Sequence, residues 1–141
     1  MLLGNFVHSL DEKNRLLIPS KLRSDLSDRI FLVRGYEGTL SIYPKEQFEK
    51  YLNHVIEFPF EKKENRDFIR LALSNATELE IDSKFRIQLP NDLVNKFHIS
   101  KEVVIVGLVN HLEIWDLTSW KKYEEENQNK FEEISERLLG E

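Results

Sequence analysis

Two short stretches of the sequence arrange charged side chains in an order that could bind phosphate or DNA. The first, SLDEKNRLLIPSKLR, covers Ser9–Arg23, and the second, EIDSKFRIQLPNDL, covers Glu80–Leu93. The matched positions are Asp11/Asp82, Lys13/Lys84, Arg15/Arg86 and Pro19/Pro90, each pair 71 residues apart. Arginine presents a planar fork of donors that fits a phosphate or the O6/N7 edge of guanine, and lysine supplies a compact charge for phosphate.

A β-turn would place these charges where they could reach a partner. An aspartate at the end of a strand can accept backbone N–H groups and brace the turn. We expect Asp11 to do so, leaving Lys13 and Arg15 to project from the tip, and a two-stranded ribbon is narrow enough for a major groove. Alternatively, Asp11 and Arg15 pair across their own turn without function, since an exposed ion pair stabilises by at most about 1 kcal/mol.

Catalysis and metal binding have little support in the sequence. The acid and base candidates lie beside exposed-looking turns rather than converging from distant segments; they are His8, Asp11, Glu12 and Asp82. There is no glycine-rich phosphate loop, no HExxH motif and no nucleophile elbow. With no cysteine and four scattered histidines, we expect no metal, no cofactor and no small-molecule ligand.

The two motifs belong to a longer internal repeat. IFLVRGYEGTLSIYPKEQFEKY at Ile30–Tyr51 lies over EVVIVGLVNHLEIWDLTSWKKY at Glu102–Tyr123, now with an offset of 72 residues. Apolar, glycine and aromatic positions keep their register, and one inserted residue reconciles the two offsets. The pattern predicts an internal duplication.

Each repeat predicts the same series of elements. Alternating residues on both sides of the charged turn predict a hairpin that ends at proline. A short helix follows, with Ser20 as N-cap in the first unit and Asn91 at its start in the second. A second hairpin and a helix come next, the helices spanning Lys45 to about Ile56 and starting at about Thr118.

The duplication predicts an α+β fold of two tandem, pseudo-twofold related units. Between them, KKENRDFIRLALSNA carries an apolar stripe with helical spacing, which predicts a packed connecting helix. The predicted organisation is 1–58 for the first unit with its trailing helix, 59–77 for the connecting helix, and 78–141 for the second unit with the C-terminal helix and acidic tail.

Composition is typical of a soluble globular protein, with 141 residues, 40% hydrophobic and 32% charged. The formal net charge of -5 lies entirely in Glu124–Glu141, so the remainder is neutral and bulk charge neither supports nor excludes DNA. No apolar run approaches the roughly 18 residues of a membrane span, and the first residues do not read as a secretory signal. We therefore expect a cytoplasmic protein that does not bind membranes.

The twin blocks LDEKNRLLIP and IDSKFRIQLP, each followed by a short helix and a hairpin, with HLEIWD near the end, resemble the MraZ family of bacterial transcriptional regulators. The resemblance covers essentially the whole chain. It implies two AbrB-like (SpoVT-AbrB) swapped-hairpin β-barrel units, a ring-shaped homo-oligomer, no enzymatic activity, and a nucleoid-associated protein. It further implies binding to repeated boxes in double-stranded DNA ahead of the division and cell-wall gene cluster.

The resemblance assigns roles to the repeated residues. Arg15 and Arg86 are expected to contact DNA, with support from Lys13, Lys84 and Asn14, while Asp11 and Asp82 brace the turns. The family commonly has glycine just before the arginine, where this chain has Asn14 and Phe85. Asparagine accepts a left-handed conformation, but phenylalanine there costs roughly 1–2 kcal/mol. We therefore expect the second turn to adopt another conformation.

Other features leave alternatives open. The chain could be a structural or protein-interaction ring that does not bind DNA, with the stripe of Phe131, Ile134 and Leu138 docking on a neighbour rather than packing locally as a solvated final helix. Trp115 and Trp120 could stack on bases, although core or subunit packing is the better interpretation. Arg66 and Arg70 could contact phosphate, although an ordinary charged helix face is favoured.

Overall fold

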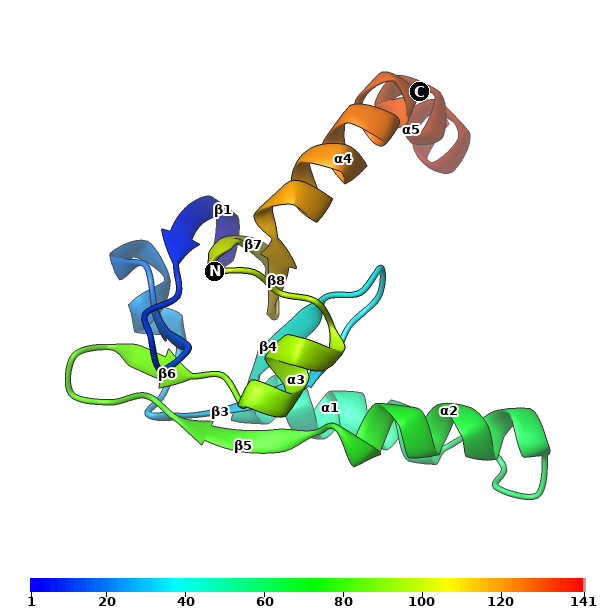
Figure 1. Ribbon diagram of the computed structural model, residues 1–141. Coiled ribbons are helices and arrows are strands. Elements are labelled where there is room, and N and C mark those ends of the chain that lie inside the picture. The colour runs from blue at the N-terminus through cyan, green and yellow to red at the C-terminus, as the bar shows by residue number, and fades with distance from the viewer. Residues whose placement is uncertain (141) are drawn as a thin grey trace.

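The computed structural model describes residues 1–140, which form eight strands and seven helical segments (Figure 1). The strands are β1 (Leu2–Ser9), β2 (Arg15–Leu17), β3 (Arg29–Arg34), β4 (Leu40–Pro44), β5 (Thr77–Glu80), β6 (Arg86–Gln88), β7 (Glu102–Val109) and β8 (Leu112–Asp116). The helices are η1 (Ser20–Asp25), α1 (Lys45–Ile56), α2 (Lys63–Ser74), α3 (Asn91–Lys96), α4 (Leu117–Asn127), η2 (Gln128–Lys130) and α5 (Phe131–Leu139). The α+β class predicted from the sequence is confirmed.

The strand order records the duplication directly. One antiparallel sheet of six strands has the order β1-β7-β8-β4-β3-β5, and β2 pairs with β6 in a separate two-stranded ribbon. Exchanging each strand with its counterpart in the other half, β1 with β5, β3 with β7 and β4 with β8, gives the same order read in reverse. The two halves are therefore related by a pseudo-twofold axis that passes between β4 and β8 and between β2 and β6.

The first hairpin of each unit is not formed as the sequence pattern predicted, by pairing of the two strands that flank the charged turn. β1 pairs with β7 of the other half along its whole length, and β2 pairs with β6, so β1 and β2 do not form a ladder with each other. Only the turn is local, since the Asp11 N–H donates to the Arg15 carbonyl at 3.1 Å. The prediction of a local hairpin is thus wrong. The exchange of strands between halves agrees with the swapped-hairpin arrangement that the family resemblance implied.

The remaining elements follow the sequence patterns closely. β3 and β4 form one hairpin and β7 and β8 the other. α1 and α4 begin within a residue of their predicted starts, and α2 begins one residue into the stretch KKENRDFIRLALSNA. Ser20 is not an N-cap, because η1 begins at Ser20 itself and Pro19 occupies the cap position without a side-chain hydrogen bond. Proline has its φ already fixed near the value that the start of a helix needs. α4 is capped instead by Asp116, whose side chain accepts from the Ser119 N–H at 3.3 Å.

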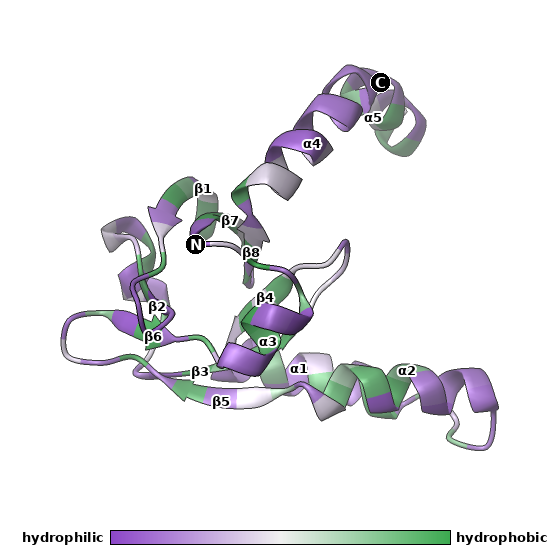
Figure 2. Cartoon of the chain, viewed as in Figure 1, coloured by the Kyte–Doolittle hydropathy of each residue, from purple (hydrophilic) through white to green (hydrophobic). Residues whose placement is uncertain are grey.

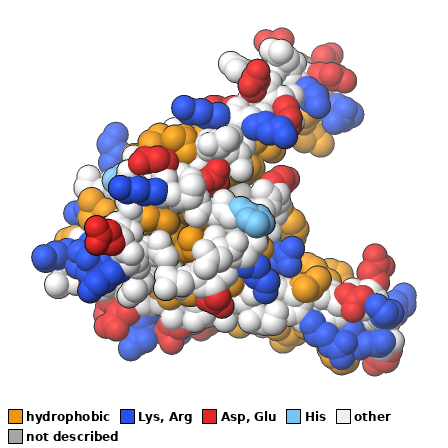
Figure 3. All heavy atoms as spheres, viewed as in Figure 1, with side chains coloured by type: hydrophobic (Ala, Val, Ile, Leu, Met, Phe, Trp, Pro, Cys, Tyr) orange, Lys and Arg blue, Asp and Glu red, His pale blue; other side chains and the backbone are white. Residues whose placement is uncertain are grey.

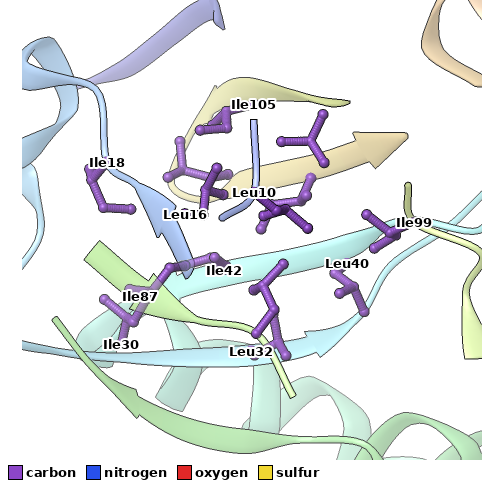
Figure 4. Close-up of a cluster of buried hydrophobic side chains, with 14 of the residues drawn as sticks. Leu10, Leu16, Ile18, Ile30, Leu32, Leu40, Ile42, Ile87, Ile99 and Ile105 are labelled. Atoms are coloured by element: carbon purple, nitrogen blue, oxygen red, sulfur yellow. The ribbon is translucent and has the colours of Figure 1, made fainter. Parts of the chain in front are cut away.

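The hydrophobic core lies between the six-stranded sheet and the β2–β6 ribbon (Figure 4). Leu16 and Ile87 face each other at the centre of the ribbon and are both 0% exposed. Around them the ribbon and both halves of the sheet contribute Ile18, Ile30, Ile42, Leu89 and Ile105. Because each half supplies one strand of the ribbon that closes the core, neither half can bury its apolar face alone.

Two helical arms extend from this body (Figure 1). Figure 2 shows hydrophobic residues on the strands of the body and along part of α2, a largely hydrophilic α4, and hydrophobic patches again on α5 at the end of the C-terminal arm. Trp115 is buried and packs edge-on against Trp120 at 5.1 Å between ring centroids, as the core interpretation predicted. The C-terminal arm has no buried residue in α4 or α5, and Phe131 is 72% exposed. No helix within residues 1–140 has the length and apolarity needed to cross a membrane.

Candidate nucleic-acid interface

The two charged turns have nearly identical backbone hydrogen bonds. Asp11 Oδ1 accepts from the N–H of Lys13 at 2.9 Å and from that of Arg15 at 2.8 Å. Asp82 Oδ1 accepts from the N–H groups of its own lysine and arginine, both at 2.9 Å. The pKa values of both carboxyls are held below their usual range, chiefly because the backbone N–H of the arginine donates to them. Each aspartate therefore stays ionised at neutral pH and fixes the turn that carries the basic residues.

The arginines pair with their own aspartates rather than projecting freely. Arg15 Nε donates to Asp11 Oδ2 at 2.6 Å, and Arg86 Nε donates to Asp82 Oδ2 at 2.9 Å. The expectation that Asp11 would leave Arg15 unpaired is therefore wrong. One carboxylate oxygen of each aspartate accepts from backbone N–H groups, and the other accepts from the guanidinium of the arginine four residues later. Among the described residues, no hydrogen bond involves the Nη atoms of either arginine, so the outer edge of each fork remains available.

Both arginines face the same way. In the ribbon register, Arg15 lies opposite Gln88 and Leu17 lies opposite Arg86, while Leu16 and Ile87 point into the core. Side chains alternate between faces along a strand, so the arginines share the outer face and are diagonal neighbours, typically about 7–8 Å apart at Cα. The side chains of Arg15 and Arg86 are 30% and 26% exposed, which places them at the surface rather than beneath other side chains.

The lysines extend the positive charge beyond the arginines. Lys13 and Lys84 are exposed, one in each turn. Figure 3 shows lysine and arginine side chains gathered at the end of the molecule where the β5–β6 turn lies, with acidic side chains beside them. The basic region is therefore local. A neutral body can still attract phosphate at such a region, because charges act within about one Debye length, near 8 Å at physiological salt.

The residue before each arginine is left-handed in both turns. Asn14 has a φ of 58° and Phe85 a φ of 60°, so the expectation of a different second turn is wrong. The backbone is fixed by symmetric bonds between the halves, in which Leu89 N–H donates to the Asn14 carbonyl at 2.9 Å and Ile18 N–H donates to the Phe85 carbonyl at 2.8 Å. Phenylalanine accepts a strain of roughly 1–2 kcal/mol to keep this geometry.

Three side chains support the turns in a way that the sequence analysis did not predict. Gln88 Nε2 donates to the Lys13 carbonyl at 3.1 Å, and Asn91 Oδ1 accepts from Asn14 Nδ2 at 2.5 Å. The guanidinium of Arg23 lies over the Phe85 ring, 4.3 Å from its centroid. Gln88 could have been found, because strict alternation places it on the same face as Arg86. The contacts of Asn91 and Arg23 join residues far apart in the sequence and leave no local signal.

The other candidate residues do not form a site. Within residues 1–140 no group of three or more histidine, aspartate and glutamate side chains is arranged to hold a metal ion. Arg66 Nη1 donates to the carbonyls of Phe60 and Glu61 at 3.2 and 2.8 Å, and Arg70 lies over the Phe60 ring. These contacts hold the chain between α1 and α2, in keeping with the favoured interpretation of an ordinary charged helix face.

Comparison with known proteins gives one consistent result. A family model described as "MraZ protein, putative antitoxin-like" matches residues 1–71 and, a second time, residues 72–141. A protein of Mycoplasmoides gallisepticum named "Transcriptional regulator MraZ" is 40% identical over 138 residues, which cover 98% of this chain and 97% of that protein. The double match of the family model agrees with the duplication read from the sequence and from the strand order.

Proposed function

The chain belongs to the MraZ family, and from that premise we propose that it is a transcriptional regulator, not an enzyme, that binds double-stranded DNA through its two charged turns. The observation that carries the proposal is the shared outer face of the β2–β6 ribbon. Arg15 and Arg86 lie on that face as diagonal neighbours, each oriented by its own aspartate. A narrow two-stranded ribbon of this kind suits the major groove.

The residues of the turns take different roles in this proposal. Arg15 and Arg86 use their Nη groups to read base edges or to clamp the duplex, because their Nε groups are held by Asp11 and Asp82. Lys13 and Lys84 contact phosphates, and Asn14 supports the first turn. Bidentate contacts to base edges carry sequence information, whereas phosphate contacts set register and orientation. The aspartates act by fixing the guanidinium planes and do not contact DNA themselves.

One ribbon offers too few contacts for tight specific binding. We propose that several copies assemble into a ring-shaped homo-oligomer, so that linked ribbons bind one duplex with the gain of multivalency. Ribbons that meet successive turns of the same face of DNA would require repeated boxes about 10 bp apart or at a simple multiple of that spacing. The proposed targets are promoter boxes ahead of the division and cell-wall gene cluster, which places the protein in the cytoplasm at the nucleoid.

The direct test is fluorescence anisotropy at fixed salt with a DNA fragment from the region upstream of the protein's own gene. Arg15→Ala and Arg86→Ala should each weaken binding by about 1–3 kcal/mol, and the double variant by more than either. Arg137→Ala, on α5, removes the same charge far from the ribbon and should leave affinity unchanged. Full affinity in the double variant would contradict the proposal.

The exposed C-terminal arm favours a second candidate, a ring that serves protein assembly without DNA. Phe131 is 72% and Leu138 75% exposed on α5, which suits contact between chains. Native mass measurement of the assembly with and without the upstream fragment separates the two functions. A ring that takes up no DNA at physiological salt supports the assembly role, whereas a defined protein–DNA stoichiometry supports the regulator.

A further inference from the structure

Phe85 is an exposed aromatic side chain at the tip of the second turn. It is 46% exposed and has a φ of 60°, a conformation that L residues with a bulky side chain adopt rarely. Its counterpart in the first turn, Asn14, accepts the same conformation far more readily. A strained residue whose ring is half open to solvent contributes little to the core, so core packing does not account for the phenylalanine at this position.

The Phe85 ring is held in a fixed position by Arg23. The guanidinium of Arg23 lies over one face of the ring, 4.3 Å from the centroid, and Arg23 Nε donates to the Ile18 carbonyl at 2.9 Å. The N–H of Ile18 in turn donates to the Phe85 carbonyl at 2.8 Å. Backbone, ring and guanidinium are therefore tied together, and the exposed part of the ring is presented in one orientation.

The chemistry of Phe85 restricts what it can recognise on DNA. A phenyl ring has no hydrogen-bond donor or acceptor, and the apolar feature that base edges present in the major groove is the C5 methyl group of thymine. Phe85 directly precedes Arg86, which lies on the outer face of the ribbon. Because Phe85 is 46% exposed and lies in the turn that leads into Arg86, a ribbon that brings Arg86 to the bases also brings the exposed edge of the Phe85 ring close to the duplex.

We infer that Phe85 contacts a thymine methyl group and that Arg23, positioned on the ring, contacts a neighbouring phosphate. The inference rests on the proposed DNA-binding function and deepens it. The first turn ends in an amide whose Nδ2 is already bonded to Asn91, and the second ends in an apolar ring. The two turns of one chain therefore recognise different base edges, and the bound box is asymmetric, with a thymine requirement only beneath the second turn.

The test compares two DNA fragments that differ only in the methyl group. Both have the upstream sequence, one with thymine and one with deoxyuridine throughout, and full-length protein is titrated by anisotropy at fixed salt. Wild type should bind the thymine fragment about fourfold more tightly for each methyl group contacted. Phe85→Asn, which copies the first turn, should bring this ratio close to one, while Tyr36→Asn, at an exposed aromatic residue in the β3–β4 turn outside the ribbon, should leave it unchanged.

The outcomes separate this inference from the proposed function. Equal binding of the two fragments by wild type, or an unchanged ratio in Phe85→Asn, would overturn the methyl contact while leaving the regulator intact. No binding of either fragment by wild type would overturn both. Thermal unfolding of Phe85→Asn, measured in parallel, should show a folded protein at least as stable as wild type, because asparagine fits the left-handed position, and its native mass should match that of the wild-type assembly.

The proposed phosphate contact of Arg23 is tested separately, by the salt dependence of DNA affinity. Arg23→Gln should lower the slope of log affinity against log salt by about one, because one phosphate contact is lost, and should also reduce the thymine preference. Arg23→Lys should restore the salt slope but not the full preference, since an ammonium group lacks the planar surface that holds the ring. An unchanged salt slope in Arg23→Gln would exclude the phosphate contact.

Discussion

The two turns of this chain share one backbone and one aspartate–arginine pair, and they differ in the side chains beside that pair. Both use an aspartate to accept two N–H groups and an arginine Nε, with distances that agree closely between the halves. The first turn is surrounded by amide groups, and the second by an aromatic ring and a guanidinium. Duplication has therefore preserved the geometry that orients the arginines while the groups beside them have diverged.

The backbone is preserved and the tip residues differ because they have different contacts. The turn backbone is bonded to the opposite half of the molecule through Ile18 and Leu89, next to core side chains that are 0–1% exposed. A change of backbone would disturb that core, whereas Asn14 and Phe85 lie at the surface, where substitution is tolerated more readily. The comparison predicts that core positions of the two halves are equivalent and that tip positions are not.

The largest effect is expected for Leu16→Ala and Ile87→Ala. These side chains face each other at the centre of the ribbon and are both fully buried. Each truncation should lower the free energy of unfolding by about 2–5 kcal/mol, because a cavity opens in the shared core. Chemical denaturation at one protein concentration measures both, since the proposed assembly would make apparent stability depend on concentration. A loss confined to one variant would show that the halves are not equivalent in the core.

Much of this fold was predictable because its signals are local. The repeat of apolar and aromatic positions gave the duplication, and the alternating patterns gave the β3–β4 and β7–β8 hairpins within a residue or two. The pairing of β1 with β7 was not readable from the residues, because a strand that pairs with its neighbour and one that pairs across the molecule carry the same alternation. Only the family resemblance pointed to that exchange.

The site was predictable in its residues and not in its contacts. Aspartate, lysine and arginine at fixed spacing identified the turns, but an arginine four residues after an aspartate can equally pair with it or extend away. The strained conformation of Phe85 could not be expected, because its support comes from Arg23 in the other half and from the Ile18–Phe85 backbone bond. Such contacts form only once the halves are interleaved.

Exchanging the two tip residues should change stability in opposite directions. Asn14→Phe should destabilise the protein by about 2 kcal/mol, because it adds left-handed strain and loses the hydrogen bond to Asn91. The new ring would also lack a cation–π partner, since Val94 occupies the position equivalent to Arg23. Phe85→Asn should stabilise it by about 0.5 kcal/mol, since relief of strain exceeds the lost cation–π contact. Thermal unfolding at matched concentration measures both changes, and equal destabilisation by the two would refute the assigned difference.

The smallest effect concerns the outer face of the ribbon. Gln88 donates to the Lys13 carbonyl at 3.1 Å, whereas its counterpart Leu17 has no polar group to offer the equivalent carbonyl of Lys84. Gln88→Leu should therefore cost about 0.5 kcal/mol, the low end for a hydrogen bond because the group is exposed.

The reciprocal variant, Leu17→Gln, should gain a similar amount if the two turn backbones are truly alike, since a donor would then meet the Lys84 carbonyl. Hydrogen exchange at the Lys13 and Lys84 amides reports each turn separately, so a change in the wrong turn is readily seen. Faster exchange at Lys13 in Gln88→Leu with slower exchange at Lys84 in Leu17→Gln is the expected result. If Leu17→Gln increases neither the stability nor the exchange protection at Lys84, the Lys84 carbonyl points in a different direction from that of Lys13. The two turn backbones would then not be equivalent at the lysines.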